Sequence, residues 1–160
     1  VAGPPDVIAR VKLAVSRSIT HAPLVTQVAA LEALTGDQTA LKHERERYAR
    51  ARRLLSTLLN SVPGVECAIP GGGLYVFPSV EGLLKSNDLG LRTPEELGRW
   101  LLDDAMIAVV PWDYFGSPDR LRMCFAVSNS VLEEALRRLA VAFSKLTGAD
   151  IAVPLAVEHR

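Results

Sequence analysis

A chain of 160 residues, 49% of them hydrophobic, has the size of one ordinary domain and enough apolar side chains to fill a core. Its 18 basic and 18 acidic side chains cancel, and no run of Lys or Arg is separated from acids, which argues against nucleic acid as a partner. The longest apolar runs are too short to span a bilayer, so no membrane segment is expected.

The two cysteines, Cys67 and Cys124, each lie in a strand-like segment, where a cysteine is usually a small buried hydrophobic residue. This usage favours a reducing, cytoplasmic setting, with a disulfide as the minor alternative. No metal site is expected. The chain begins at Val1, without methionine, in a segment that reads as the middle of a longer sequence, so we expect it to be a fragment.

Two helices are expected in the first forty residues. The first begins at Pro4 and Pro5, because proline is tolerated in the first turn of a helix. Residues 18–23 break it, and Pro23 opens the second helix, which Gly36 ends. Thr20 and His21 lie in the break, where their side chains either point at a neighbour or a ligand or satisfy their own backbone.

The third and longest helix is predicted over residues 39–62. Apolar side chains recur on one face, while charges of both signs at i, i+4 spacing cover the rest, which is typical of a solvated face. A helix of this length can also bridge two domains, because only part of it need be buried. The predicted apolar face consists of Leu41, Tyr48, Ala51, Leu55, Leu58 and Val62.

Two strands, residues 65–69 and 74–78, are predicted on either side of a Pro-Gly-Gly-Gly turn. The glycines match no nucleotide-binding spacing, and we interpret them as a turn that approaches another backbone or a ligand so closely that a Cβ would obstruct it. Residues 79–92 are expected to be an irregular surface segment. The capping box at 93–96 then predicts a helix, and residues 106–110 a strand covered on both faces.

A strand over residues 121–128 carries the main functional hypothesis, because its side chains alternate between an apolar face and a face with one arginine. Arg122 stands there beside small side chains, which leave room for a planar anion against its guanidinium. The alternative is that Arg122 lies on a solvated face and pairs loosely with Asp119 or a neighbouring carboxylate. The apolar face consists of Leu121, Met123, Phe125 and Val127, and the opposite face of Arg122, Cys124, Ala126 and Ser128.

A second capping box at 130–133 predicts the last helix, which Gly148 ends, and residues 149–160 are expected to form a tail. The elements together indicate an α+β fold in which helices cover a small mixed or antiparallel sheet. The helices of the first forty residues are expected to pack against something else.

Four segments carry a family resemblance: SITHAPLVTQVAALEAL, PGVECAIPGGGLYVFP, MIAVVPWDYFG and LRMCFAVSNSVLEEALRRL. In this order they resemble the C-terminal part of the fold-type I pyridoxal-phosphate enzymes, and within these the class I/II aminotransferases, over residues 1–148. The resemblance implies a remnant of the cofactor-binding large domain over residues 1–38. It also implies a C-terminal small domain over residues 39–148, with the helix 39–62 joining the two domains.

The same resemblance implies roles for individual residues. Arg122 corresponds to the arginine that binds the α-carboxylate of the amino-acid substrate, and its planar fork of donors suits that group. Gly72, Gly73 and Tyr75 are expected on the small-domain side of the substrate cleft. Trp112 stands where the family usually has glycine, so we expect its indole to narrow or reshape the pocket.

The resemblance further implies a homodimer, in which Thr20 and His21 lie near the subunit boundary, close to the cofactor or substrate of the partner chain. The implied reaction transfers an amino group from an amino acid to a 2-oxo acid with pyridoxal 5'-phosphate as cofactor. In the family the Schiff-base lysine, the aspartate that pairs with the pyridine nitrogen and the phosphate cup all precede Val1. We therefore expect an additional N-terminal cofactor domain, without which the 160 residues are inactive.

Two other interpretations stay open on the residues alone. The first is a non-catalytic aminotransferase-like domain that serves amino-acid binding or dimerisation. The second is an unrelated α+β domain whose likeness to the family is accidental.

Overall fold

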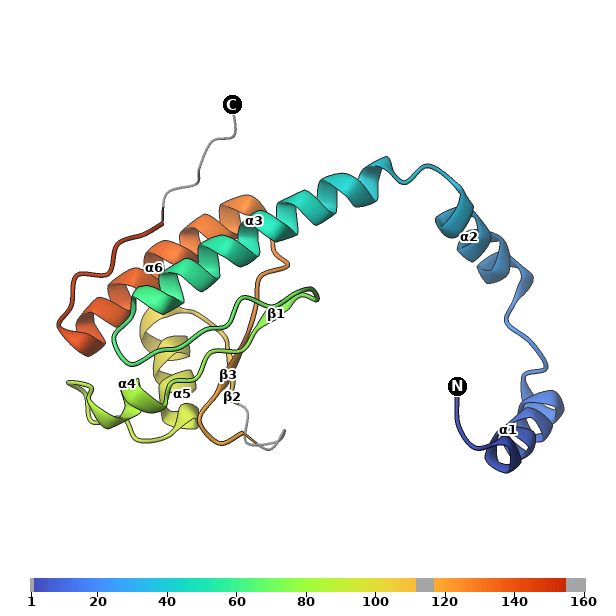
Figure 1. Ribbon diagram of the computed structural model, residues 1–160, viewed down its shortest axis with the longest axis horizontal. Coiled ribbons are helices and arrows are strands. Elements are labelled where there is room, and N and C mark those ends of the chain that lie inside the picture. Colours follow the sequence, from blue (N-terminus) through green and yellow to red (C-terminus); the bar gives the residue numbers. More distant parts are fainter. Residues whose placement is uncertain (1, 112–116, 155–160) are drawn as a thin grey trace. The chain divides into compact units, whose positions relative to one another are not determined.

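The computed structural model describes residues 2–111 and 117–154 (Figure 1). The chain divides into two compact units, Val1–His43 and Glu44–Arg160. Its helices and strands are, in order, α1 (Pro5–Ser18), α2 (Leu24–Thr35), α3 (Thr39–Ser61), β1 (Tyr75–Val76), α4 (Glu81–Lys85), α5 (Pro94–Ala105), β2 (Val110–Pro111), β3 (Leu121–Cys124) and α6 (Asn129–Thr147).

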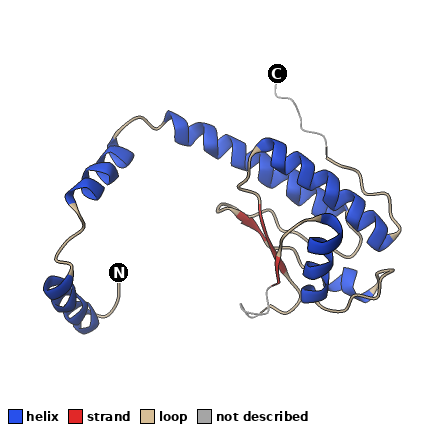
Figure 2. Ribbon diagram, turned by 180° about the vertical axis from the view of Figure 1, so that it is seen from behind, coloured by secondary structure: helices blue, strands red, loops and turns tan. Residues whose placement is uncertain are grey.

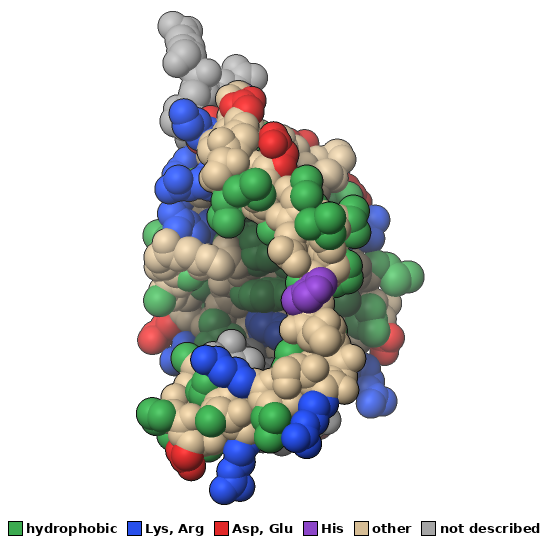
Figure 3. Space-filling model, turned by 90° about the vertical axis from the view of Figure 1, so that its right-hand side faces the viewer, with side chains coloured by type: hydrophobic (Ala, Val, Ile, Leu, Met, Phe, Trp, Pro, Cys, Tyr) green, Lys and Arg blue, Asp and Glu red, His purple; other side chains and the backbone are tan. Residues whose placement is uncertain are grey.

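The N-terminal unit contains helices without a single buried side chain. The start of α1 after Pro4 and that of α2 after Pro23 confirm the proline signals of the sequence. Apolar side chains of both helices are exposed, among them Leu34 at 81% and Val25 at 74%, and Figure 3 shows such side chains on the surface. This unit therefore presents an apolar surface whose burial would be favourable.

The second unit is built on an antiparallel sheet in which three strands of the described residues follow the order β1-β3-β2. Tyr75 of β1 stands opposite Cys124 of β3, and Val110 of β2 opposite Arg122. α3 and α6 run next to each other beside this sheet, while α5 contacts α6 and β2 (Figures 1 and 2). The sheet is thus antiparallel rather than mixed, and helices pack with it as expected for an α+β protein.

The alternation predicted for residues 121–128 is confirmed as far as Phe125, but the strand β3 itself ends at Cys124, and Val127, expected on the apolar face, is only half-buried. Leu121, Met123 and Phe125 are at most 4% exposed, whereas Arg122 is half-buried and Cys124 is exposed. The buried face joins one core with side chains of α3, α5 and α6. The members of this core from α3, α5 and α6 are Ala51, Leu55, Leu58, Leu59, Leu97, Leu101, Ala105, Leu132, Leu136, Leu139, Ala140, Ala142, Phe143 and Leu146.

α3 contributes to this core with its C-terminal half only. The bounds predicted from the sequence agree with the structure to within one residue. Leu41, which we expected on the apolar face, is 54% exposed, and burial begins at Ala51. The charged first turns of α3 therefore lie outside the hydrophobic core.

Helix caps account for the ends of α5 and α6. The capping box of α5 is confirmed, because Thr93 accepts a hydrogen bond from the backbone N–H of Glu96 and the Glu96 carboxylate accepts one from that of Thr93. The predicted start of α6 is wrong by two residues: the cap is Ser128, whose hydroxyl accepts an N–H of the first turn, and not Ser130. Gly148 ends α6 in the left-handed conformation, as predicted.

The strand predicted over residues 65–69 is reduced to an isolated bridge between Glu66 and Ser79. The side-chain amide of Asn60 replaces a neighbouring strand there: its nitrogen donates to the carbonyl of Cys67, and its oxygen accepts from the N–H of the same residue, both at 2.8 Å. A side chain from the end of α3 has thereby satisfied the backbone groups that a ladder would have used.

Two further expectations are corrected. Residues 106–110 are not a strand covered on both faces, because Met106 ends α5 with a φ of 56° and is 70% exposed, and Val110 is 37% exposed. Residues 79–92, expected to be irregular, contain the short helix α4, whose Leu83 and Leu84 are buried.

Among the described residues, no helix combines the length and the apolar character needed to cross a membrane.

The end of α3 and the start of α4 cross at two glycines. Gly64 has a φ of 78°, and a Cβ on it would lie 2.4 Å from the backbone nitrogen of Leu83 and 2.5 Å from the carbonyl carbon of Gly82. A Cβ on Gly82 would lie 2.8 Å from the Cα of Gly64. The two backbones are in direct contact and joined by a 2.8 Å hydrogen bond from the N–H of Leu83 to the Gly64 carbonyl.

We expect Gly64→Ala to lower the free energy of unfolding by at least about 2 kcal/mol, because the added Cβ meets backbone atoms and the φ is left-handed. Gly71→Ala is the matched control: a Cβ there meets nothing within 4 Å, so stability should change by less than about 0.5 kcal/mol. Urea unfolding of the three proteins, followed by circular dichroism, measures both changes. Equal stability of the two variants would contradict the close crossing.

The two cysteines are free and differ in exposure. Cys67 is buried, which raises the pKa of its thiol, whereas Cys124 is exposed, contrary to the expectation that both are buried. We expect a disulfide-exchange reagent such as DTNB to label one thiol of the folded chain rapidly and both thiols after unfolding. Cys124→Ser should abolish the rapid phase. Rapid labelling of the Cys124→Ser protein in the folded state would show that Cys67 is accessible.

Candidate functional site

The candidate site lies on the face of the sheet that points away from the core, and its centre is Arg122. The guanidinium carbon of Arg122 lies 4.7 Å from the centroid of the Tyr75 ring, so the two groups make a cation–π contact. Among the described residues the side chain of Arg122 forms no hydrogen bond and no ion pair. Asp119, the partner considered for a solvated Arg122, instead accepts a 2.6 Å hydrogen bond from the hydroxyl of Ser79.

A second arginine–aromatic pair stands next to the first. The guanidinium carbon of Arg120 lies 5.5 Å from the ring centroid of Phe77, and its Nη1 donates to the carbonyl of the same residue at 3.1 Å. Arg120 thus uses part of its hydrogen-bonding capacity to join its strand to the neighbouring one. Arg122 differs from Arg120 because no described residue occupies its donors.

Two arginines of α3 hold the segments that carry the site. Arg47 donates to the carbonyl of Val127, just after β3, and forms an ion pair with Glu44 at 2.6 Å. The hydrogen bond from Arg47 lowers the pKa of the Glu44 carboxyl. Arg52 donates from Nη1 to the carbonyl of Pro70 at 2.7 Å and so fixes the glycine turn before β1.

The glycine turn does not approach another backbone of the described chain, which was one of the two reasons expected for its glycines; the other, approach to a ligand, stays a prediction. Cβ atoms on Gly72 or Gly73 would meet no described atom within 4 Å, so this chain does not crowd the turn. Gly73 has a φ of 79°, which is a sufficient reason for glycine at that position. The turn leads into β1. Tyr75 is the first residue of that strand, and it contacts Arg122.

Thr20 and His21 belong to the N-terminal unit and make local contacts. The hydroxyl of Thr20 donates to the carbonyl of Ile19 at 2.6 Å, and Nδ1 of His21 lies 2.9 Å from the carbonyl of Ala22. Both therefore bond to adjacent backbone, as the structural alternative for this turn predicted. Thr20 also has a φ of 63°, an uncommon conformation for a residue other than glycine. Trp112 lies outside the described residues.

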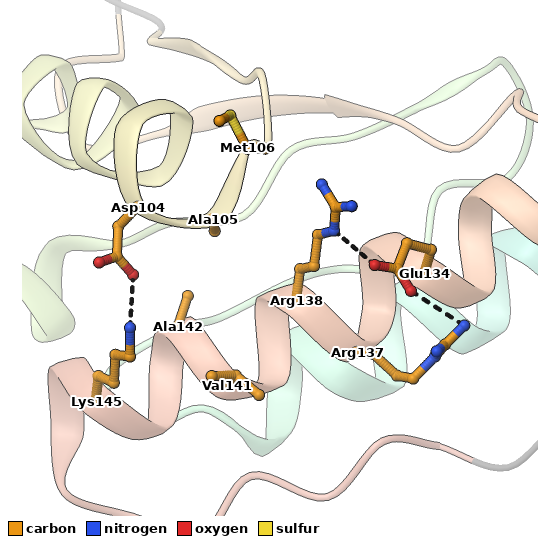
Figure 4. A pocket seen from close by; sticks show the side chains of 9 residues that line it. All are labelled: Asp104, Ala105, Met106, Glu134, Arg137, Arg138, Val141, Ala142 and Lys145. Carbon is orange, nitrogen blue, oxygen red and sulfur yellow. Dashed lines mark hydrogen bonds and ion pairs between the residues drawn. The ribbon is translucent and has the colours of Figure 1, made fainter.

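Two hollows of the described surface lie elsewhere. One of about 430 Å³ lies between the end of α5 and α6, and Figure 4 shows that its charged side chains face one another in ion pairs. Lys145 pairs with Asp104 at 3.0 Å, and Glu134 accepts from Arg138 at 2.8 Å. The other, of about 850 Å³, is lined by residues of α4, of the start of α5 and by Asp119. Neither contains Arg122.

Sequence reasoning located Arg122 and Tyr75 but missed the contact between them. In the observed register Tyr75 stands opposite Cys124, two residues along β3 from Arg122, so the pair is diagonal. Only the register brings the two side chains together, and the sequence offered no signal for it beyond the alternation of each strand. The anchoring roles of Arg47 and Arg52 were also missed, because both belong to what the pattern presented as a solvated charged face.

Comparison with known proteins identifies the family of the chain. The family model described as aminotransferase class I and II matches residues 1–139. An aspartate aminotransferase of Streptomyces avermitilis is 37% identical over 141 residues, which are 87% of this chain and 35% of that protein. The crystal structure of the aspartate aminotransferase from Rhizobium meliloti aligns with a TM-score of 0.79 at 33% identity, covering 91% of this chain and 37% of that one.

An aspartate aminotransferase from Thermus thermophilus, crystallised with maleate, aligns with a TM-score of 0.71 at 30% identity, covering 88% of this chain and 35% of that one. The chain thus spans about a third of the length of the curated relatives it matches, 35% for the Streptomyces avermitilis protein. The family model covers most of the chain. The chain belongs to the class I and II aminotransferase family.

Proposed function

We propose that the chain is the C-terminal segment of a pyridoxal-phosphate-dependent aminotransferase and that Arg122 binds the α-carboxylate of its substrates. One observation carries this proposal. In a member of the family, the side chain of Arg122 stands on the sheet face away from the core, with one aromatic contact and no hydrogen bond or ion pair to a described residue. An arginine in this position has its donors available for a carboxylate.

The chemistry of the reaction explains why an arginine suits this position. A guanidinium binds a carboxylate through two parallel N–H donors, which fix both the position and the plane of the bound group. An amino acid and a 2-oxo acid share the carboxylate next to the reacting carbon, so one arginine serves both substrates. Holding that carboxylate fixes the direction of the Cα–H bond, which is what proton removal requires.

The lysines of this chain do not fit a Schiff-base role. Lys85 and Lys145 are 71% and 56% exposed and form ion pairs with Glu81 and Asp104. Lys12 and Lys42 are exposed on α1 and α3. None of the four is buried among apolar side chains, as a lysine that forms a Schiff base would be. Pyridoxal phosphate supplies an electron sink when it is bound to such enzymes. Because no lysine here suits the Schiff base, we propose that the cofactor's lysine lies outside these 160 residues and that they are inactive alone.

The N-terminal unit supports the same assignment. We propose that residues 1–38 belong to the large, cofactor-binding domain, that residues 39–148 form the small domain, and that 149–160 follow as a tail. The exposed apolar side chains of α1 and α2 suit helices that the rest of a larger domain covers. Thr20 and His21 lie near the subunit boundary of the proposed cytoplasmic homodimer.

A second candidate is a non-catalytic aminotransferase-like domain that binds amino acids or mediates dimerisation, because the available guanidinium of Arg122 would suit amino-acid binding without catalysis as well. The two candidates differ in what the complete natural protein does. An aminotransferase takes up pyridoxal phosphate and changes its absorbance when an amino donor is added. A binding domain stays colourless with the added cofactor.

We expect Arg122→Lys, tested in the complete protein, to lower kcat/KM for the amino acid and for the 2-oxo acid by about 10- to 100-fold. Lysine keeps the charge but loses the paired donors, which corresponds to about 1.4–2.8 kcal/mol of binding. Cofactor content, measured by absorbance, should stay unchanged. The KM of both substrates should rise together, because both present the same carboxylate.

Arg120→Lys is the matched control, since it makes the same chemical change on the same strand face at an arginine that already bonds to the protein. It should lower kcat/KM by less than about threefold. An Arg122→Lys enzyme within twofold of the parent for both substrates would refute carboxylate binding by Arg122. Equal losses in the two variants would assign the effect to the strand and not to the guanidinium.

A further inference from the structure

We infer that Tyr75 is a positioning residue for Arg122: its ring holds the guanidinium by the flat face and so presents the N–H edge to the substrate carboxylate. The inference rests on the carboxylate role proposed for Arg122. It gives Tyr75, which the family resemblance places on the small-domain side of the substrate cleft, an action through the arginine.

The pairing of the strands creates this contact. Tyr75 is opposite Cys124, and Val76 is opposite Met123, so continuation of the register places Phe77 opposite Arg122. Arg122 nevertheless leans toward the diagonal neighbour Tyr75, with 4.7 Å between the guanidinium carbon and the ring centroid. This is within the 6 Å or so over which a ring face attracts a cation.

The two contacts of the guanidinium are compatible because they use different parts of it. An aromatic ring interacts with the flat face of the group, whereas a carboxylate binds to its edge in the plane of the N–H donors. The ring consumes no donor. Stacking therefore restricts the orientation of the side chain before the substrate arrives, and less rotamer freedom is lost on binding.

The neighbouring pair Arg120–Phe77 is an arginine–aromatic contact in which the arginine also bonds to the protein backbone. Its distance to the ring is longer, 5.5 Å, and Nη1 of Arg120 already donates to the Phe77 carbonyl. Arg122 lies closer to its ring and gives no donor to any described residue. The two arginines share a strand face but differ in the availability of the N–H edge.

A double-mutant cycle in the complete, cofactor-loaded protein tests the inference, with Tyr75→Phe, Tyr75→Leu, Arg122→Met and the double variant Tyr75→Leu/Arg122→Met. Two readouts are the KM and kcat of both substrates and the Kd of maleate, an unreactive dicarboxylate. Tyr75→Phe keeps the ring and should stay within about twofold of the parent. Tyr75→Leu should raise KM and the maleate Kd by about 3- to 20-fold with kcat within about threefold.

The background without the guanidinium separates positioning from other roles. In Arg122→Met protein, Tyr75→Leu should change the maleate Kd by less than about twofold, because no guanidinium is left to orient. A full effect of Tyr75→Leu in that background would overturn the inference, since Tyr75 would then act on the substrate or on the fold. So would a Tyr75→Leu protein that binds maleate as the parent does.

The cycle also distinguishes failure of the inference from failure of the proposed function. If Arg122→Met leaves KM and maleate binding unchanged, the carboxylate role of Arg122 is wrong. If Arg122→Met weakens both but the Tyr75 variants do not, only the positioning role is wrong. Tyr75 is 46% exposed, so its truncation removes little core, and Tyr75→Met replaces the leucine variant if that protein does not fold.

Discussion

The antiparallel pairing of β1 with β3 is the constraint on which both the core and the candidate site depend. Because side chains alternate along a strand, the register that buries Val76 and Met123 also places Tyr75 and Arg122 together on the opposite face. A shift by one residue would exchange the two faces and put the guanidinium into the core. The hydrophobic effect that stabilises this unit therefore also determines where the guanidinium of Arg122 stands.

Much of the fold follows from local patterns in the sequence. The helices of residues 39–62 and 93–105 carry periodic apolar residues or caps, and the structure confirms them. The incorrect predictions concern segments whose structure depends on residues distant in sequence or on competing local hydrogen bonds. Residues 65–69 have the composition of a strand, but the amide of Asn60 satisfies the backbone of Cys67 instead. Met106 reads as strand, yet it closes α5 in a left-handed conformation.

The sequence predicted which side of the sheet Arg122 occupies, but not which residue it contacts. Alternation alone indicated that Arg122 faces away from the core, and the order of four segments suggested a role for it. The contact with Tyr75 depends on the register between two strands about forty-five residues apart, and no pattern within either strand contains that information. The backbone contact expected at the glycine turn is absent from the described chain, because a positive φ at Gly73 and a crowded backbone both favour glycine, and sequence alone does not separate them.

The charge pattern of α3 does not reveal that some of its arginines bond to other segments of the fold. Arg47 and Arg52 belong to a run that looks like a solvated coat, yet one bonds to the segment after β3 and the other to the turn before β1. Their long side chains reach past the edge of the core and end on backbone carbonyls. α3 and the two strands of the site are therefore connected by polar contacts as well as by the shared core.

The crossing of Gly64 and Gly82 has a consequence for how this family branch can diverge. A side chain added at either glycine would meet main-chain atoms of the opposite segment, and main chain is present whatever residue stands there. No compensating substitution at the opposite position can relieve the overlap. Each glycine is therefore constrained on its own, and a lineage that loses either one has to move the two backbone segments apart where they meet.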